Sequence, residues 1–236
     1  MSIARHYEKL SAHNMDYYYP LAQKRTLISE ISKKYFHGKL IDIGCGEMPY
    51  KGIVMDNARV ANYIGVDIQN ETYQQLVKPD LIWDGKHIPM PDDAADCAML
   101  IEVLEHVPQP DQVLMEINRV MKRDGVCLVT IPFLWTLHDI PYDEYRYTPF
   151  ALRRLAEQAS FEVVIMESFG GWHASMASMI ALYCRRGLHR NRFQSILSKT
   201  LFPVVRYLMK KDVHFPKDRF YEGQMITGIW CLLKKK

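Results

Sequence analysis

Residues 40–50 read Leu-Ile-Asp-Ile-Gly-Cys-Gly-Glu-Met-Pro-Tyr, an apolar run that passes directly into a turn with two glycines. The residues before the turn have the composition of a buried parallel strand. Gly44 and Gly46 carry no side chains, so the backbone can bend sharply there and a ligand can lie close against it. Asp42 is expected to direct a carboxylate into the same crevice. This stretch predicts the first strand of an α/β domain and the edge of a binding site.

Glycine-rich turns after a first strand also occur in dinucleotide-binding domains. Their pattern, G-x-G-x-x-G, requires a third glycine three residues after the second, for close helix packing around a pyrophosphate. This chain has Pro49 at that position. A cationic nucleoside ligand without phosphate therefore fits the turn better.

Two further apolar runs also end in acids. Asp67 closes the run 63–68, at the position where nucleoside-binding α/β folds place a carboxylate that binds ribose. Asp84 closes the run 79–84. Three acids at three successive predicted strand ends indicate a nucleoside site rather than three solvated loop acids.

These motifs resemble, in their order, those of class I S-adenosylmethionine (SAM) methyltransferases, and within them the type 11 subgroup. The resemblance covers about residues 40–169. It implies a Rossmann-like fold, SAM as cofactor and S-adenosyl-L-homocysteine as product, with Asp84 near the adenine amino group. The residues that it implies for cofactor binding are Asp42, Gly44, Cys45, Gly46, Asp67, Ile68, Asp84, Gly85, Ile101, Glu102 and His106.

The segment after the fourth apolar run also matches the E-x-x-E-H metal triad of ubiquinone-pathway O-methyltransferases. Spacings of three and four residues predict that Glu102, Glu105 and His106 share one helical face. The alternative is an acid at a helix start beside a histidine that supports the pocket. We expect no metal here and keep the triad as the alternative.

A long segment, residues 132–149, follows the fifth predicted strand and concentrates aromatic and charged side chains. Ligands bind beyond the carboxyl ends of strands in doubly wound sheets, and long ordered loops are often functional. Its pattern H-D-x-P-x-D-x-x-R-Y-T resembles type 11 members linked to bacterial surface-carbohydrate and glycolipid pathways. We expect this loop to face the acceptor.

The candidate catalytic residues lie in this loop. With an ordinary pKa near 6.5, His138 could take the proton from an acceptor hydroxyl, and Asp139 or Asp143 could orient its ring. Arg146 could hold an anionic group through its two-pronged donor geometry. Tyr147 completes the set.

A purely structural interpretation of the same loop stays open. His138 and Arg146 could simply tie the loop to the domain, because methyl transfer to a nucleophilic acceptor depends mostly on positioning. Thr148 and Pro149 predict the N-cap and the first residue of the next helix.

Alternating strands and helices predict an α/β, Rossmann-like, doubly wound and mostly parallel seven-stranded sheet, with an antiparallel last strand after a helical insertion. Residues 1–38 are expected to form an N-terminal helical cap, and residues 39–169 the SAM-binding core. Residues 170–222 are expected to form a basic helical insertion, and residues 223–236 the final strand and a basic tail.

The charge of the chain is uneven. From Arg185 onward there are thirteen Lys and Arg against three Asp and Glu. Apolar residues between 196 and 209 alternate with basic ones, which predicts a basic amphipathic helix that Pro203 kinks or restarts. One hypothesis is contact with an anionic membrane, giving access to a lipid-linked acceptor. The alternative is a substrate lid or a homodimer face.

The composition of the chain argues against several other kinds of protein. The five cysteines lack C-x-x-C spacing, which argues against a disulfide framework and a zinc site. Residues 1–9 lack an apolar signal core, and no stretch has the length to span a bilayer. We expect a cytoplasmic protein, with peripheral contact at the inner membrane face under the membrane hypothesis.

The expected function is SAM-dependent O-methylation of a sugar, a glycolipid or another small-molecule acceptor. Methylation of RNA or other nucleic acid is the first alternative, but the chain has no recognisable RNA-binding module and no N-P-P-Y-type motif. A non-catalytic SAM-binding protein with this fold is the second alternative.

Overall fold

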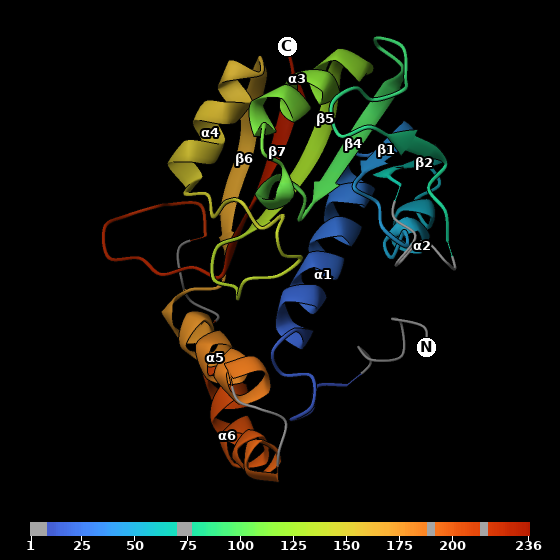
Figure 1. The fold of residues 1–236 in the computed structure, drawn as a ribbon. Helices are drawn as coiled ribbons and strands as arrows, with labels where there is room; N and C mark the ends of the chain where they lie inside the picture. Colours follow the sequence, from blue (N-terminus) through green and yellow to red (C-terminus); the bar gives the residue numbers. More distant parts are fainter. Residues whose placement is uncertain (1–8, 70–76, 188–191, 213–216) are drawn as a thin grey trace.

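The computed structural model describes residues 9–69, 77–187, 192–212 and 217–236, in which seven strands form one sheet of order β3-β2-β1-β4-β5-β7-β6 (Figure 1). Strand β7 is antiparallel to β5 and β6, and the other pairs are parallel. The predicted doubly wound, mostly parallel sheet with an antiparallel last strand is confirmed. The strands are β1 Gly38–Ile43, β2 Val60–Ile68, β3 Leu81–Trp83, β4 Ala95–Ile101, β5 Met121–Pro132, β6 Phe161–Phe169 and β7 Gly228–Lys235.

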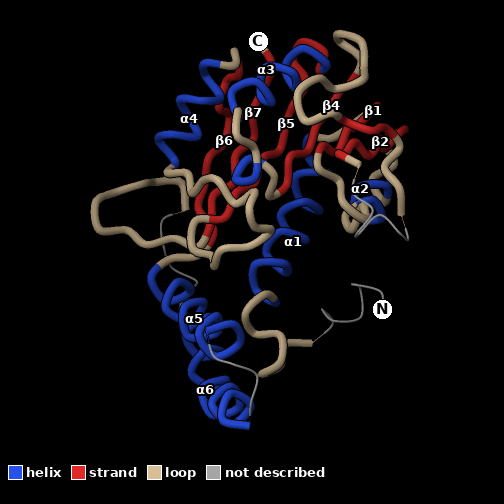
Figure 2. The backbone as a smooth tube through the Cα atoms, viewed as in Figure 1, coloured by secondary structure: helices blue, strands red, loops and turns tan. Residues whose placement is uncertain are grey.

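Helices cover both faces of this sheet (Figure 2). Helices α3 and α4 pack on one face, and α1 and α2 pack on the other. The helices are α1 Tyr18–Tyr35, α2 Lys51–Met55, α3 Pro110–Val120, α4 Pro149–Gln158, α5 Trp172–Leu182 and α6 Arg192–Lys211, with a short 3-10 turn η2 Leu104–His106 and a π-helical turn η3 Tyr183–Gly187.

The core follows from the alternation of side chains along the central strands. Leu40 faces α1 and packs in one cluster with Ile28, whereas Ile41 faces α3 and packs in the other with Leu114. All four side chains are fully buried. Apolar side chains that point to both faces of β1 are what a sheet covered on both faces requires.

Helices α5 and α6 form a pair that extends away from the sheet on the side of loop 133–148 (Figure 1). Their contact has its own small core, which includes Ala177, Ala181 and Val205. Helix α6 contains the predicted basic amphipathic segment and continues through Pro203. None of the helices in the described ranges is long and apolar enough to cross a bilayer. Residues 1–8 of the predicted cap, and 188–191 and 213–216 of the predicted insertion, lie outside the described residues.

Two strands begin at positions that the sequence pattern does not mark. Residues 123–125 read Arg-Asp-Gly, which is typical of a turn, but β5 begins at Met121 and includes them. The pairing with β4 shifts register there, and Asp124 has a left-handed φ of 65°. Residues 123–125, which have the composition of a turn, therefore form an irregularity within a continuous strand. Strand β7 begins at Gly228, inside the predicted final segment of residues 223–236.

A carboxylate is enclosed between β1 and β2. Asp42 is 2% exposed and accepts a hydrogen bond from the hydroxyl of Tyr63. Burial raises the pKa of Asp42 to about 7, although the hydrogen bond from Tyr63 acts in the opposite direction. Asp42 is thus held by Tyr63 in this structure, and a contact between Asp42 and the cofactor remains a prediction.

The N-cap of α4 generates a first prediction. The hydroxyl of Thr148 accepts the N–H of Ala151 at 3.2 Å, and Pro149 is the first helical residue. We expect Thr148→Ala to lower the free energy of unfolding by about 1 kcal/mol, because one N–H at the helix start loses its partner. Urea unfolding measures the change. Thr148→Ser should retain most of the stability, and equal losses in both variants would contradict the capping role.

The buried Asp42 generates a second prediction. Since its pKa is higher in the folded state than in the unfolded chain, its contribution to stability is lost as the pH rises from about 4 to about 7. We expect Asp42→Asn to gain stability relative to the parent protein across that window, and the difference to be constant above it. Urea unfolding between pH 4 and pH 8 measures this, and a pH-independent difference would refute it.

Candidate functional site

The order of the strands creates a crevice between β1 and β4. The chain runs from β1 outward through β2 to β3, and then returns to place β4 on the other side of β1. In such sheets ligands bind beyond the carboxyl ends of the strands, where the connections diverge. Gly44 follows β1 and Glu102 follows β4, so both lie at this point.

The glycines of the turn after β1 serve different purposes. Both have left-handed backbones, with φ of 70° at Gly44 and 51° at Gly46. A Cβ on Gly44 would lie 2.4 Å from Cγ2 of Val103, so that glycine is required for packing. A Cβ on Gly46 would meet no described atom within 4 Å. The turn is therefore open at Gly46, where a ligand can approach the backbone, whereas Cys45 is buried.

Asp67 joins this turn to the end of β2. Its Oδ2 accepts the N–H of Gly46 at 2.7 Å, and its Oδ1 accepts the N–H of Ile68 at 2.7 Å. Burial raises the pKa of the Asp67 carboxyl, while these two hydrogen bonds act to lower it. Each carboxylate oxygen keeps a lone pair that can accept a ligand hydroxyl.

Asp84 and Gly85 follow β3, next to β2 in the sheet, but Asp84 is engaged in its own turn. Its Oδ1 accepts the N–H groups of His87 at 2.6 Å and Lys86 at 2.8 Å, and these bonds lower its pKa. The side chain is exposed. An adenine contact from Asp84 remains a prediction.

Glu102 follows Ile101 at the end of β4 in a strained conformation, with a φ of 57°. Its Oε2 lies 2.9 Å from Nζ of Lys24 on α1, and its Oε1 accepts the hydroxyl of Thr130 at 3.2 Å. Burial acts to lower the pKa of Lys24, but the neighbouring Glu102 leaves it raised. This pair connects α1 to the crevice.

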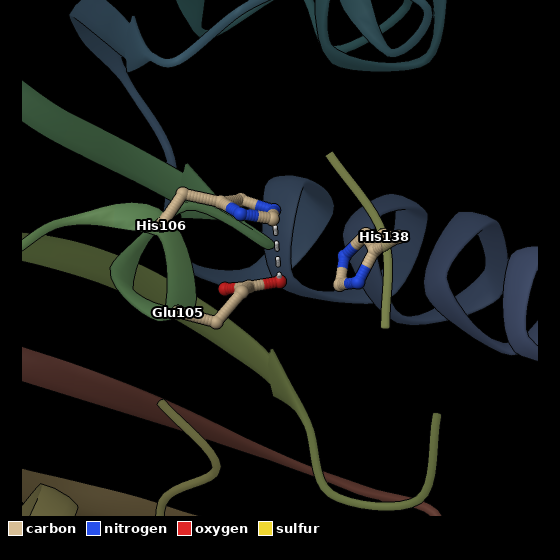
Figure 3. Close-up of side chains that lie close together, drawn as sticks. All are labelled: Glu105, His106 and His138. Atoms are coloured by element: carbon tan, nitrogen blue, oxygen red, sulfur yellow. Dashed lines mark ion pairs between the residues drawn. The ribbon is translucent and has the colours of Figure 1, made fainter. Parts of the chain in front are cut away.

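Glu105, His106 and His138 meet beside the crevice (Figure 3). One ligand atom from each side chain lies within 4.8 Å of the others. Oε1 of Glu105 lies 3.8 Å from Nε2 of His106, and the two imidazole rings are 4.7 Å apart between centroids. Burial raises the pKa of Glu105 to about 8, and the charge of Glu102 adds to this shift. The cluster joins the segment after β4 to the long loop after β5.

The expected helical face of Glu102, Glu105 and His106 is not present. Only Leu104–His106 form a short 3-10 turn, and Glu102 lies before it with a left-handed backbone. The carboxylate of Glu102 is instead paired with Lys24. The group of potential metal ligands found in the described residues replaces Glu102 with His138.

Arg146 is engaged within its own loop. Its guanidinium donates to both carboxylate oxygens of Asp143, at 2.6 and 2.9 Å, and to the carbonyls of Thr136 and Tyr145. This pairing lowers the pKa of Asp143 to about 2. Oδ2 of Asp143 also accepts the N–H of His138 at 3.1 Å. Arg146 therefore stabilises the loop in this structure.

The other two candidate catalytic residues differ in exposure. Tyr147 is buried, and its hydroxyl donates to the carbonyl of Leu104 at 3.1 Å. Asp139 has a largely exposed side chain, with its Oδ2 3.8 Å from Nε2 of His106. Asp143 is thus beside His138, whereas Asp139 is beside His106.

Two adjoining grooves lead from this site along α5. The first is lined by Lys24, Glu102 and Trp135 among others. The second, of about 540 Å³, continues from Trp135 to Tyr183 and Arg186. The guanidinium of Arg186 lies 4.9 Å from the centre of the Trp135 ring. Both grooves have more apolar than polar lining.

Sequence reasoning missed Lys24, Trp135 and Arg186 as residues of the site. Lys24 lies on the predicted cap helix, where a lysine on a polar face gives no sign of an inward partner. Trp135 is in the loop expected to face the acceptor, so its aromatic ring was a usable signal. The contact of Arg186 with Trp135 depends on how α5 packs, which no local pattern reveals.

Comparison with known proteins agrees with this geometry. A family model described as a methyltransferase domain, of type 11, matches residues 41–129. A protein of Mycolicibacterium smegmatis, named as a probable S-adenosylmethionine-dependent methyltransferase, is 28% identical over 159 residues, covering 63% of this chain and 60% of the relative. The chain spans 60% or less of the length of the curated relatives it matches.

Solved structures share the fold. A SAM-dependent methyltransferase from Archaeoglobus fulgidus aligns with 93% of this chain and 100% of its own, at 18% identity and a TM-score of 0.55. The [4+2]-cyclase SpnF aligns with 90% of this chain and 80% of its own, at 18% identity and a TM-score of 0.57. Residues 41–129 therefore match a type 11 methyltransferase domain, and the chain has the fold of class I SAM-dependent methyltransferases.

Proposed function

We propose that the protein transfers the methyl group of SAM to a hydroxyl oxygen of a small acceptor. The observation that carries this proposal is the turn at Gly44–Gly46, which is open at Gly46 and tied to Asp67 at the crevice. In the reaction, an oxygen lone pair attacks the methyl carbon and the carbon–sulfur bond breaks. The bonding electrons return to sulfur, giving the neutral thioether of S-adenosylhomocysteine, and the hydroxyl proton passes to solvent at the partly exposed side of His106 and His138.

Side-chain charges suit each part of the cofactor. Asp67 accepts the ribose hydroxyls through its remaining lone pairs. The pair of Lys24 and Glu102 has the charges that match a zwitterionic methionine end, with the lysine toward the carboxylate and the glutamate toward the amino group. The sulfonium cation then lies near carboxylates, which favours its binding in a partly buried site.

We assign the two adjoining grooves to the acceptor. They begin at Glu102, which we place beside the methionine end of the cofactor, and continue past Trp135 to Tyr183 on the π-helical turn after α5. A polar end with a hydroxyl at the cluster and an apolar or ring-shaped body along the grooves fits this lining. A sugar or a glycolipid has this combination.

Helix α6 supplies the proposed membrane contact. Ile196, Val204 and Tyr207 are exposed on it, beside the exposed basic residues Arg206 and Lys210. Apolar side chains interleaved with lysine and arginine are typical of helices that lie on anionic lipid. Such a contact would deliver a lipid-linked acceptor to the grooves along α5.

The [4+2]-cyclase SpnF shares this fold, so the fold alone does not identify the reaction. Calorimetric titration with S-adenosylhomocysteine and a turnover assay with hydroxylated acceptors separate the alternatives. Cofactor binding without S-adenosylhomocysteine formation would favour a binding protein or a different reaction. Turnover confined to RNA would contradict the small-molecule acceptor.

A substitution at Gly46 tests where the cofactor binds. We expect Gly46→Ala to weaken S-adenosylhomocysteine binding at least tenfold, because a methyl group would occupy the open side of the turn while the left-handed backbone costs only about 1–2 kcal/mol. Gly52→Ala in α2 is the matched control, since its Cβ also meets no described atom and its backbone is not left-handed. Unchanged binding in Gly46→Ala, measured by calorimetry, would place the ligand elsewhere.

Vesicle flotation tests the membrane contact. We expect binding to vesicles containing phosphatidylglycerol but not to phosphatidylcholine alone, and release at high salt. Arg206→Glu with Lys210→Glu should weaken binding at least tenfold, because each basic residue near an anionic surface contributes about 1 kcal/mol. Lys33→Glu with Lys34→Glu on α1 is the matched control. Equal binding by both double variants would contradict a role for α6.

A further inference from the structure

The carboxylate of Glu105 lacks a partner. The residue is fully buried, and neither Oε1 nor Oε2 has a hydrogen-bond partner in the described part of the chain. Its Oε1 lies 3.8 Å from Nε2 of His106. Buried carboxylates are costly unless they are paired, hydrogen-bonded or bound to a metal.

The backbone holds Glu105 in this position. Its carbonyl accepts the N–H groups of Glu144 at 2.8 Å and Tyr145 at 3.1 Å, so the loop after β5 is fastened directly over it. The hydroxyl of Tyr147 donates to the neighbouring carbonyl of Leu104. The unpartnered carboxylate is therefore part of a well-connected segment.

His106 is oriented as metal-binding histidines commonly are, with one ring nitrogen directed to an oxygen and the other toward the carboxylate of Glu105. Nδ1 of His106 lies 3.1 Å from the carbonyl of Tyr142, which leaves Nε2 facing Glu105. Nδ1 of His138 lies 3.4 Å from Oδ2 of Asp143, without forming a hydrogen bond of good geometry. Asp143 is itself fixed by Arg146.

We propose that Glu105, His106 and His138 bind one divalent first-row transition metal ion, with Zn²⁺ as the representative species. Two imidazole nitrogens and one carboxylate oxygen suit Zn²⁺ or a similar ion better than Mg²⁺, which prefers oxygen ligands. Metal–ligand bonds of about 2.1 Å hold ligand atoms within about 4.2 Å of one another. The three ligand atoms now lie within 4.8 Å of one another, so a small inward movement of the side chains brings them to the distances that a bound ion requires (Figure 3).

Three protein ligands leave at least one coordination position open. The side chains of His106 and His138 are 21% and 22% exposed, so solvent and small molecules reach the ion from that side. Asp139 stands at the same opening, near His106. Resting on the proposed function, this position would receive the acceptor hydroxyl, whose proton a bound cation makes more acidic.

The assignment differs from a triad of Glu102, Glu105 and His106. Glu102 already has Lys24 and Thr130 as partners, and its carboxylate is not in the cluster. His138 comes from the loop after β5 and is the ligand that completes the set. If Glu102 is a ligand, Glu102→Gln weakens metal binding and His138→Ala does not. If His138 is the ligand, the reverse holds.

Metal titration of the full-length protein tests the proposal. After removal of bound metal with a chelator, calorimetry should show one Zn²⁺ per chain, and Co²⁺ should give visible absorption bands of a protein-bound ion. Glu105→Gln and His138→Ala should each weaken Zn²⁺ binding at least tenfold. Glu102→Gln and the surface variant His173→Ala should bind like the parent protein. Circular dichroism checks that each variant is folded, and the partly exposed His138 keeps the test available where Glu105→Gln fails to fold.

The outcomes separate this site from the proposed function. Equal Zn²⁺ binding by all variants, or none by a parent protein that binds S-adenosylhomocysteine, would overturn the metal site and leave the methyltransferase proposal standing. Zn²⁺ binding that depends on His138 in a protein without S-adenosylhomocysteine affinity would support the metal site and overturn the proposed function.

Discussion

The carboxylate of Asp67 is the interaction on which the binding edge depends. It accepts N–H groups from Gly46 and Ile68, so it fastens the turn after β1 to the end of β2. The turn has left-handed residues and an open side at Gly46, and Asp67 adds a side-chain bond to the backbone bonds that Gly44 and Cys45 donate to the carbonyl of Val66. One acid thus keeps a strained turn in place and still presents oxygens toward the crevice.

Some polar side chains around the crevice have hydrogen-bond or ion-pair partners in the protein, and others have none among the described residues. Asp143 and Arg146 satisfy each other, Glu102 is paired with Lys24, and Asp42 is paired with Tyr63. These groups mainly hold elements together. Within the described ranges, the carboxylate of Glu105, Nδ1 of His138 and the hydroxyl of Thr136 are buried without a hydrogen-bond partner. Chemistry is most readily assigned to groups whose bonding is incomplete in the protein alone.

Much of the fold was predictable because its signals are local. Apolar runs ending in acids predicted the strands, and Thr148 with Pro149 predicted the start of α4. The site was less predictable, since its contacts depend on the packing of distant segments. The sequence favoured a ligand-binding role for Arg146, whose guanidinium is instead occupied by Asp143. It also placed Glu102 with Glu105, whereas the left-handed backbone at Glu102 turns the two carboxylates to different partners.

Strand β7 lies between β5 and β6, although it is the last strand in the chain. Until residues 228–235 have emerged from the ribosome, β6 has no neighbour in the sheet and one side of β5 is unpaired. Open strand edges of this kind are prone to pair with other chains. The nascent protein is therefore expected to depend on chaperones until β7 has emerged, and truncation before residue 228 should cause aggregation rather than partial activity.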